Sequence, residues 1–449
     1  TMGNFIGSIW LMIVSLGVLV TFHEFGHFWA ARCCGVKVLR FSVGFGKPLW
    51  MHRNRHGTEF VVAAIPLGGY VKMLDEREGE VHPAELNQAF NRKTVLQRIA
   101  IVAAGPIANL LLCMAMLWAM FVVGKQDYSA TIGRADGLAA EAGLSPGERI
   151  LRIDDRSVSS WDDASMQLTA AAMDKRDVRV LTSSDTASSS EHTLRLSRLP
   201  AGFDERRVAA LAGIGWQFML QPPVIAEVVK GSVSDGLLKP GDRIIAIDGQ
   251  PTRSTEDIIP QVQALGAHGG PGMIEVARGE DHLALEISPR KSPQGQWMIG
   301  VRPAAMPAPD YDSRQQYGVF AAVPVAINET GRMAADSLGM IKRMLTGQAS
   351  VKAISGPITI ARAANASAAR GLDWFLYFLA LLSLSLAIIN LMPIPTLDGG
   401  HLLYYLIELI KGSPISERAM IAGQYIGLAV LAGLMGLAFY NDILSLVPR

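Results

Sequence analysis

The chain has 449 residues, half of them hydrophobic, with a mean hydropathy of +0.26 and a formal net charge of +1. This length allows several domains, and the hydropathy is high for a soluble protein. The near-zero charge argues against a nucleic-acid-binding protein, which needs an excess of basic residues. The cysteines are Cys33, Cys34 and Cys113, so the long segment from residue 124 to 373 has no disulfide framework.

Four apolar runs are long enough to cross a bilayer, over residues 5–22, 99–123, 374–392 and 419–440. The first run lacks a preceding basic region and a following small-residue cleavage site, so we expect a retained span and not a signal peptide. The loop between the first two runs carries eleven lysine and arginine residues. The positive-inside rule therefore predicts that this loop is cytoplasmic and that both chain ends and residues 124–373 lie outside.

A His-Glu-x-x-His pattern follows the first run. His23 and His27 lie four residues apart and would share one face of a helix, which suits two imidazoles that bind one zinc ion. Glu24 lies beside them, where a base could take a proton from water. The alternative is two packed histidines with a buried glutamate. It is disfavoured because three ionisable groups in an apolar helix need a functional reason.

After the histidine motif, residues 40–50 are rich in aromatic side chains and glycine. We expect a re-entrant hairpin that dips into the membrane, with an exposed surface loop as the alternative. Residues 58–65 are typical of a β-strand, and residues 66–70 of a turn into a second strand over 71–74. This hairpin could offer its edge to an extended substrate, or it could be purely structural.

The second run contains Gly105-Pro106-Ile107-Ala108-Asn109. A proline inside a helix frees a backbone carbonyl, and a buried asparagine needs a partner on another helix. We assign these residues to packing and give them no chemical role.

A third metal ligand is expected at the end of the third run, where Pro393 and Pro395 must break the helix just before Asp398. The first and third runs both end on the cytoplasmic side, so Asp398 should reach the depth of the two histidines. His401 is the rival ligand and ranks lower because it lies beyond two glycines. Asn390 could bind a substrate carbonyl or the oxyanion, or could cap the helix.

The outer segment contains an internal repeat, because residues 137–155 match residues 231–249 at a constant offset of 94. Each copy reads as a short helix, a Pro-Gly turn, a strand and a tight Asp-x turn. The pattern resembles the PDZ signature, more closely in the second copy, because the first departs at Glu148 and Asp155. The resemblance implies that each copy binds a peptide end or strand. Ile214 and Val301 are candidate groove-floor residues, with core packing as the alternative.

The sequence predicts a multi-domain membrane protein: an α-helical bundle of four spans with a membrane-associated β-hairpin and two inserted α+β PDZ domains. Residues 1–124 would form the first two spans with the zinc motif, and residues 125–221 and 222–306 the two PDZ domains. Residues 307–371 would form a connector, with amphipathic helices near 316–345 and 358–369 that lie on the membrane or brace the spans. Residues 372–449 would form the last two spans and carry the third ligand.

The His-Glu-x-x-His motif, residues 105–109, the inserted PDZ pair and residues 397–400 occur in the order and spacing of the site-2 protease family of intramembrane metalloproteases. The resemblance implies a Zn²⁺ endopeptidase of the bacterial inner membrane that cleaves single-span membrane proteins. The implied substrate is an anti-sigma factor of an envelope stress response that another protease has already trimmed outside the membrane. The resemblance also implies that the strands over residues 58–74 clamp the substrate and that the PDZ pair filters substrates by size.

Site residues follow from both lines of reasoning: the metal ligands His23, His27 and Asp398, the base Glu24, and the substrate-binding residues Asn390, Ile65, Gly68, Gly69, Tyr70, Pro393 and Pro395. Two alternatives remain open. One is a protease of broad specificity that removes leftover membrane segments such as signal peptides. The other is a non-catalytic, membrane-anchored PDZ scaffold.

Overall fold

The computed structural model describes residues 2–184, 188–200, 202–203, 205–219, 222–292, 295–304, 309–349 and 355–446. It forms two units, of which one comprises Thr1–Gln126 with Arg314–Arg449 and the other Asp127–Ser313. The expected domain boundaries at residues 221 and 306 lie outside the described residues.

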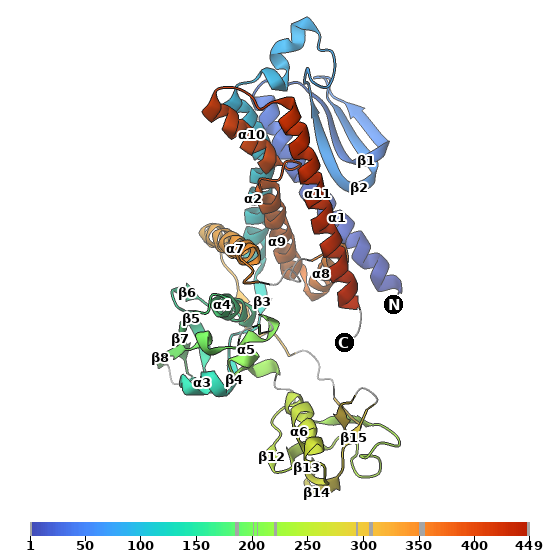
Figure 1. Cartoon of the computed structure of the whole chain (residues 1–449), viewed down its shortest axis with the longest axis vertical. Helices are drawn as coiled ribbons and strands as arrows, with labels where there is room; N and C mark the ends of the chain where they lie inside the picture. Colours follow the sequence, from blue (N-terminus) through green and yellow to red (C-terminus); the bar gives the residue numbers. More distant parts are fainter. Residues whose placement is uncertain are drawn as a thin grey trace. The chain divides into compact units, whose positions relative to one another are not determined.

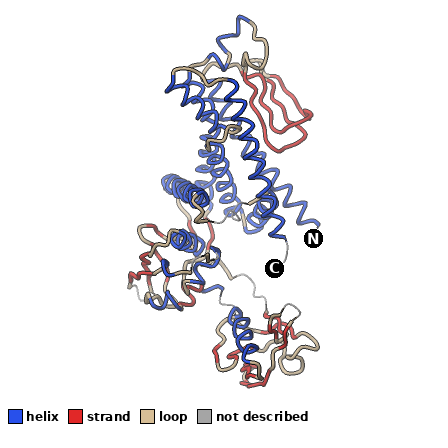
Figure 2. The backbone as a smooth tube through the Cα atoms, viewed as in Figure 1, coloured by secondary structure: helices blue, strands red, loops and turns tan. Residues whose placement is uncertain are grey.

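Four long apolar helices dominate the first unit: α1 (Met2–Cys33), α2 (Val95–Val123), α9 (Leu372–Leu391) and α11 (Glu417–Leu446) (Figures 1 and 2). Each is long and apolar enough to cross a membrane. Helix α1 continues past the expected end at residue 22, so the whole His-Glu-x-x-His motif is helical. Helix α2 begins at a capping box, in which the side chains of Thr94 and Gln97 each accept a hydrogen bond from the other residue's backbone amide. Pro106 lies in the interior of this helix.

Helix α1 approaches α2 very closely at Gly26. A Cβ atom there would lie 2.2 Å from the Ala104 carbonyl oxygen, so glycine is required for this contact. Helix α2 packs on its other side against α9, and Ser383 of α9 donates a hydrogen bond to the Asn109 carbonyl oxygen at 2.7 Å. The three helices that surround the candidate metal ligands are therefore held at fixed spacing.

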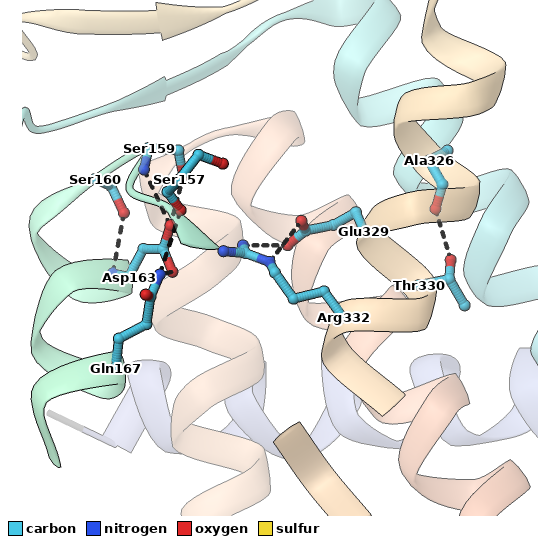
Figure 3. Close-up of polar contacts among 9 residues, drawn as sticks. All are labelled: Ser157, Ser159, Ser160, Asp163, Gln167, Ala326, Glu329, Thr330 and Arg332. Carbon is cyan, nitrogen blue, oxygen red and sulfur yellow. Dashed lines mark hydrogen bonds and ion pairs between the residues drawn. The ribbon is translucent and has the colours of Figure 1, made fainter. Parts of the chain in front are cut away.

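The two expected amphipathic helices are α7 (Ala322–Leu345) and α8 (Pro357–Arg370). Helix α7 starts later than residue 316, because β18 (Ser313–Gln315) is followed by an irregular segment and a turn over residues 316–321. Its buried residues, such as Ala322 and Ala326, share one apolar core with α2 and α9, which favours the bracing alternative. Within α7, Arg332 pairs with Glu329 at 2.7 Å, and the Thr330 hydroxyl donates to the Ala326 carbonyl (Figure 3).

Residues 40–50 and 58–74 were expected to form two separate hairpins, and this pairing was wrong because both segments belong to one sheet. That residues 40–50 dip into the membrane stays a prediction. This sheet consists of β1 (Val38–Arg53) and β2 (Glu59–Met73). Residues 40–43 have Cα partners both at 59–62 and at 69–72, and residues 50–53 pair with 59–62. Each long strand therefore folds back on itself, and four segments lie in the order 50–53, 59–62, 40–43 and 69–72 (Figure 1).

Glycine permits the reversal of β2. Gly68 has a φ of +102°, and a Cβ atom there would lie 2.4 Å from the Phe45 ring. The reversal falls between Ile65 and Gly69, where residues 66–70 were expected to turn. Exposed apolar side chains remain on the sheet, among them Leu49 and Trp50, which are 73% and 56% exposed.

The second unit contains two modules with the same topology. The first comprises β4 (Ile132–Ala135), α3 (Gly137–Glu141), β5 (Arg149–Ile153), β6 (Arg156–Ser157), α4 (Trp161–Met173), β7 (Val178–Ser183), β8 (Ser189–Leu194) and β9 (Ile214–Trp216). The second comprises β10 (Ile225–Val228), β11 (Arg243–Ile247), β12 (Gln250–Pro251), α6 (Thr255–His268), β13 (Gly272–Arg278), β14 (Asp281–Ile287) and β17 (Val301–Pro303). The sheets run β6-β5-β7-β8 with β4-β9, and β12-β11-β13-β14 with β10-β17.

The repeat extends to backbone geometry, because Asp154 and Asp248 occupy matching turns with φ values of 52° and 50°. Each module has its own apolar core. In the first, Ser160 caps α4, and Asp163 accepts hydrogen bonds from the Ser159 amide and from the Gln167 side chain (Figure 3). The expected short helix is present as α3 in the first module. Only turns occur at the matching place in the second, where Gly236 adopts a φ of +82°.

Candidate metal centre

His23 and His27 project from the same face of α1, as their spacing predicts. Their Nε2 atoms lie 3.2 Å apart, and the rings meet edge to face with centroids 4.8 Å apart. Both histidines are buried, with 9% and 8% exposure. An apolar helix tolerates two such polar rings only if they share a partner.

Asp398 supplies that partner. Helix α9 ends at Leu391, the two prolines lie in the break that follows, and α10 (Asp398–Lys411) begins with Asp398 itself. Its Oδ2 atom lies 3.2 Å from His23 Nε2 and 3.4 Å from His27 Nε2. Gly399 permits this placement, because a Cβ atom there would lie 2.2 Å from the Met392 carbonyl oxygen.

The far end of α10 is fixed to α2. The Glu408 carboxylate accepts two hydrogen bonds from the Arg98 guanidinium, at 2.7 and 3.1 Å, in a mostly buried pair. The same guanidinium lies over the Tyr405 ring, 4.8 Å from its centroid. Asp398 is thus carried on a helix that is anchored at both ends.

The geometry of the three side chains fits a zinc ion. Atoms that each lie about 2.0–2.1 Å from one tetrahedral ion are separated by about 3.3–3.4 Å, and the three observed separations are 3.2, 3.2 and 3.4 Å. Within the described residues, the buried Asp398 Oδ2 makes no hydrogen bond of acceptable geometry despite these short distances. Two imidazoles and a carboxylate form a donor set typical of catalytic zinc, with one position left for water.

Helix α2 supports the two imidazoles. The sequence analysis did not predict this role of α2. His27 Nδ1 lies 2.9 Å from the Ile101 carbonyl oxygen, and Asn109 Nδ2 lies 3.4 Å from His23 Nδ1. A Cβ atom on Gly105 would lie 2.3 Å from His27 Nε2, so the rings rest directly on the α2 backbone. The signal was present in the sequence, since Asn109 is a polar side chain within an apolar run.

Glu24 lies between this cluster and the sheet. Its carboxylate interacts electrostatically with both histidines and with Asp398, and it interacts with the backbone amide of Val71 in β2. A Cβ atom on Gly69 would lie 3.2 Å from Glu24 Cγ. The acidic side chain is therefore close to both the candidate ligands and one segment of the sheet.

The other candidate residues have varied surroundings. Gly68, Gly69 and Tyr70 lie in the segment of β2 that approaches Glu24, and Ile65 is 51% exposed beside it. Asn390 lies in the last turn of α9, and Pro393 and Pro395 lie in the break that leads to Asp398. His401 is not part of the ligand cluster found among the described residues.

The two PDZ groove candidates differ in burial. Ile214 is 2% exposed and lies in the core of the first module, which favours its packing alternative. Val301 packs at the edge of the second core and is half-buried.

Comparisons with known proteins agree with this site. Residues 11–434 match the family model described as peptidase family M50. A Xylella fastidiosa protein that bears the name of a zinc metalloprotease is 69% identical over 99% of this chain and 100% of its own length. The regulator of sigma-E protease RseP from Salmonella typhimurium is 40% identical over 96% of this chain and 97% of its own. The Escherichia coli protein of that name is 38% identical over 98% and 99%.

Among solved structures, a PDZ domain of the SdrC-like protein from Listeria monocytogenes covers 18% of this chain and 85% of its own, at 23% identity and a TM-score of 0.16. The family match and the full-length relatives agree with the motifs at His23, His27 and Asp398. The chain therefore belongs to peptidase family M50, the site-2 protease family, and is a zinc metalloendopeptidase.

Proposed function

We propose that this enzyme cleaves single-span membrane proteins within or near the bilayer of the bacterial inner membrane. The observation that carries the proposal is the convergence of His23, His27 and Asp398 beside Glu24, on helices that are apolar enough to lie in lipid. A substrate of this class is an anti-sigma factor already shortened outside the membrane, as the relatives named regulator of sigma-E protease suggest.

Each residue at the site has a distinct role in the proposed reaction. His23, His27 and Asp398 hold the zinc ion, which when bound polarises a water molecule and the scissile carbonyl. Glu24 takes a proton from the attacking water and delivers it to the departing amine. Asn390 would donate a hydrogen bond to the carbonyl oxygen as negative charge develops there.

The substrate must be extended for this reaction, because a helix uses its carbonyl groups in internal hydrogen bonds. The β2 segment around Gly69 offers a strand edge next to Glu24. An extended substrate segment that pairs with this edge would present its backbone to the base. Tyr70 and Ile65 on β2, and Pro393 and Pro395 in the break after α9, would then contact its side chains.

The remaining regions would control which proteins reach the site. The basic residues of the loop between α1 and α2 support an active site that faces the cytoplasm. The two modules of the second unit then lie in the periplasm as PDZ domains, where they would bind peptide ends and exclude large extracellular parts.

A Glu24→Gln variant tests the proposed base. We expect normal zinc content and a loss of cleavage of about 10²- to 10⁴-fold, because the amide cannot accept the proton. The assay uses full-length enzyme in proteoliposomes with a single-span substrate, and zinc is measured by elemental analysis. Normal turnover by this variant would exclude Glu24 as the base. Retained zinc with lost turnover would also exclude a purely non-catalytic scaffold.

A further inference from the structure

Asn109 lies beside His23, and the oxygen of its side-chain amide has no hydrogen-bond partner within the described residues. It is fully buried on α2, and its Nδ2 atom lies 3.4 Å from His23 Nδ1. Its Oδ1 atom has no hydrogen-bond partner in the described part of the chain. A buried polar atom without a partner costs about 1–3 kcal/mol, so this oxygen calls for an explanation.

Zinc binding determines which nitrogen of His23 carries the proton. A neutral imidazole has one N–H group, and a metal-binding nitrogen must offer a lone pair. The nitrogen that faces His27 and Asp398 is Nε2, so the proton of a zinc-binding His23 is on Nδ1. That N–H group requires an acceptor, and in the Asn109 amide only Oδ1 can accept.

His27 has this arrangement already. Its Nδ1 lies 2.9 Å from the carbonyl oxygen of Ile101, which can only accept a hydrogen bond. The Nδ1–H group of His27 is therefore fixed by α2, and Nε2 is left with its lone pair toward the cluster. Ile101 and Asn109 are eight residues apart on α2, about two helical turns, so one helix can serve both imidazoles.

We infer that Asn109 is the positioning residue of His23, with its amide turned so that Oδ1 accepts a hydrogen bond from Nδ1–H. The oxygen and nitrogen of an amide occupy almost equal volumes, so this half-turn does not alter the packing. The bond satisfies the unused oxygen and presents Nε2 to the metal. The inference rests on the proposed role of His23 as a zinc ligand.

Two substitutions of Asn109 separate an acceptor from a donor. The isosteric Asn109→Asp keeps an acceptor and removes the donor, so we expect its zinc affinity to stay within about threefold of wild type. Asn109→Leu removes both, and we expect zinc to bind about 10–100-fold more weakly. The measurement is competition with a chromophoric chelator on the full-length protein in detergent. The visible spectrum of the cobalt-substituted protein gives a second readout of ligand geometry.

Ser383→Ala is the matched control, because the Ser383 hydroxyl donates its hydrogen bond to the backbone carbonyl of Asn109 and not to the side-chain amide. We expect it to leave zinc affinity unchanged. The inference is overturned if Asn109→Asp loses zinc affinity as far as Asn109→Leu, or if Asn109→Leu binds like wild type. If Asn109→Leu does not fold, the zinc affinity of Asn109→Asp still tests the inference. A His23→Ala variant that keeps full zinc affinity would instead contradict the proposed metal site.

Discussion

Carboxylates with a buried oxygen occur in both units, and their surroundings differ. In the second module, Asp242 is 1% exposed and accepts hydrogen bonds from the Lys239 amide at 2.8 Å and from the Arg278 guanidinium at 2.7 and 2.8 Å. Asp398 in the first unit also lies close to polar groups, yet its Oδ2 makes no acceptable hydrogen bond within the described residues. Instead, it converges with two imidazole nitrogens on a common point.

The difference separates structural polar groups from functional ones. A buried carboxylate whose two oxygens both accept hydrogen bonds, such as Asp242, stabilises the fold. A carboxylate whose lone pair faces the lone pairs of two histidines lowers stability until a cation binds there. Removal of Asp398 should therefore affect metal binding, and removal of Asp242 should affect folding. The predictions below are ordered by the size of the expected effect.

The largest effect is expected from Asp398→Ala. Loss of one of three protein ligands should weaken zinc binding by more than about 100-fold. The unfolding temperature in the presence of a chelator should stay the same or rise, because within the described residues the Asp398 Oδ2 makes no hydrogen bond of acceptable geometry that the substitution would remove. Chelator competition measures the first quantity, and thermal unfolding of the full-length protein in detergent measures the second.

His401→Ala is the control for this variant, since His401 was the rival ligand and lies three residues further along α10. Its zinc affinity should equal that of wild type. Full zinc retention by Asp398→Ala would exclude Asp398 as a ligand. A loss in His401→Ala as large as that in Asp398→Ala would contradict the choice of Asp398 over His401.

A smaller loss of zinc affinity is expected from Gly105→Ala. The new methyl group would lie 2.3 Å from His27 Nε2 and 2.8 Å from His23 Cε1, so both rings must shift. We expect zinc to bind about 10–100-fold more weakly, as with other changes to groups that orient ligands. Gly433→Ala on α11 is the control, because a Cβ atom there meets nothing within 4 Å. Unchanged affinity in Gly105→Ala would show that the rings do not rest on α2.

The smallest effect on the enzyme is expected from Asp242→Asn, which should lower the unfolding free energy of the second module by about 1–3 kcal/mol and leave zinc affinity unchanged. The Arg278 pair holds the pKa of Asp242 below its usual value. Its stabilisation is therefore complete above the unfolded pKa of about 3.9 and is lost as the pH falls through the folded pKa.

Hydrogen exchange of the β11 amides in the full-length protein measures this effect. The difference between wild type and Asp242→Asn should shrink as the pH is lowered below about 4. Glu148, the matching residue of the first module, accepts a hydrogen bond from the Ser145 amide but lies 3.9 Å from His192. Glu148→Gln should therefore destabilise its module less, and an equal or larger loss would contradict this comparison.

The sequence was sufficient for the features that depend on local spacing. His23 and His27 share a helix face because they are four residues apart, and Pro393 and Pro395 end α9 because proline cannot continue a helix. The meeting of Asp398 with the histidines followed from counting spans, since two helices that exit on the same side bring their ends together.

Other features depended on contacts that local patterns do not encode. Residues 40–43 pair with two separate segments of β2, and such a register is decided by non-local packing. The role of α2 was missed for a different reason. Asn109 was assigned to packing, although the argument applied to the ionisable groups of α1 also holds for a buried amide in an apolar helix.

X-ray absorption at the zinc edge of the full-length, zinc-loaded enzyme tests the central claim most directly. The account predicts two imidazole nitrogens and one carboxylate oxygen from the protein, at about 2.0–2.2 Å, with light-atom scattering alone. The His23→Ala and Asp398→Ala variants should each lose one of these ligands. A sulfur shell at about 2.3 Å, which would implicate Cys33 or Cys34, or a spectrum unchanged in both variants would contradict the account.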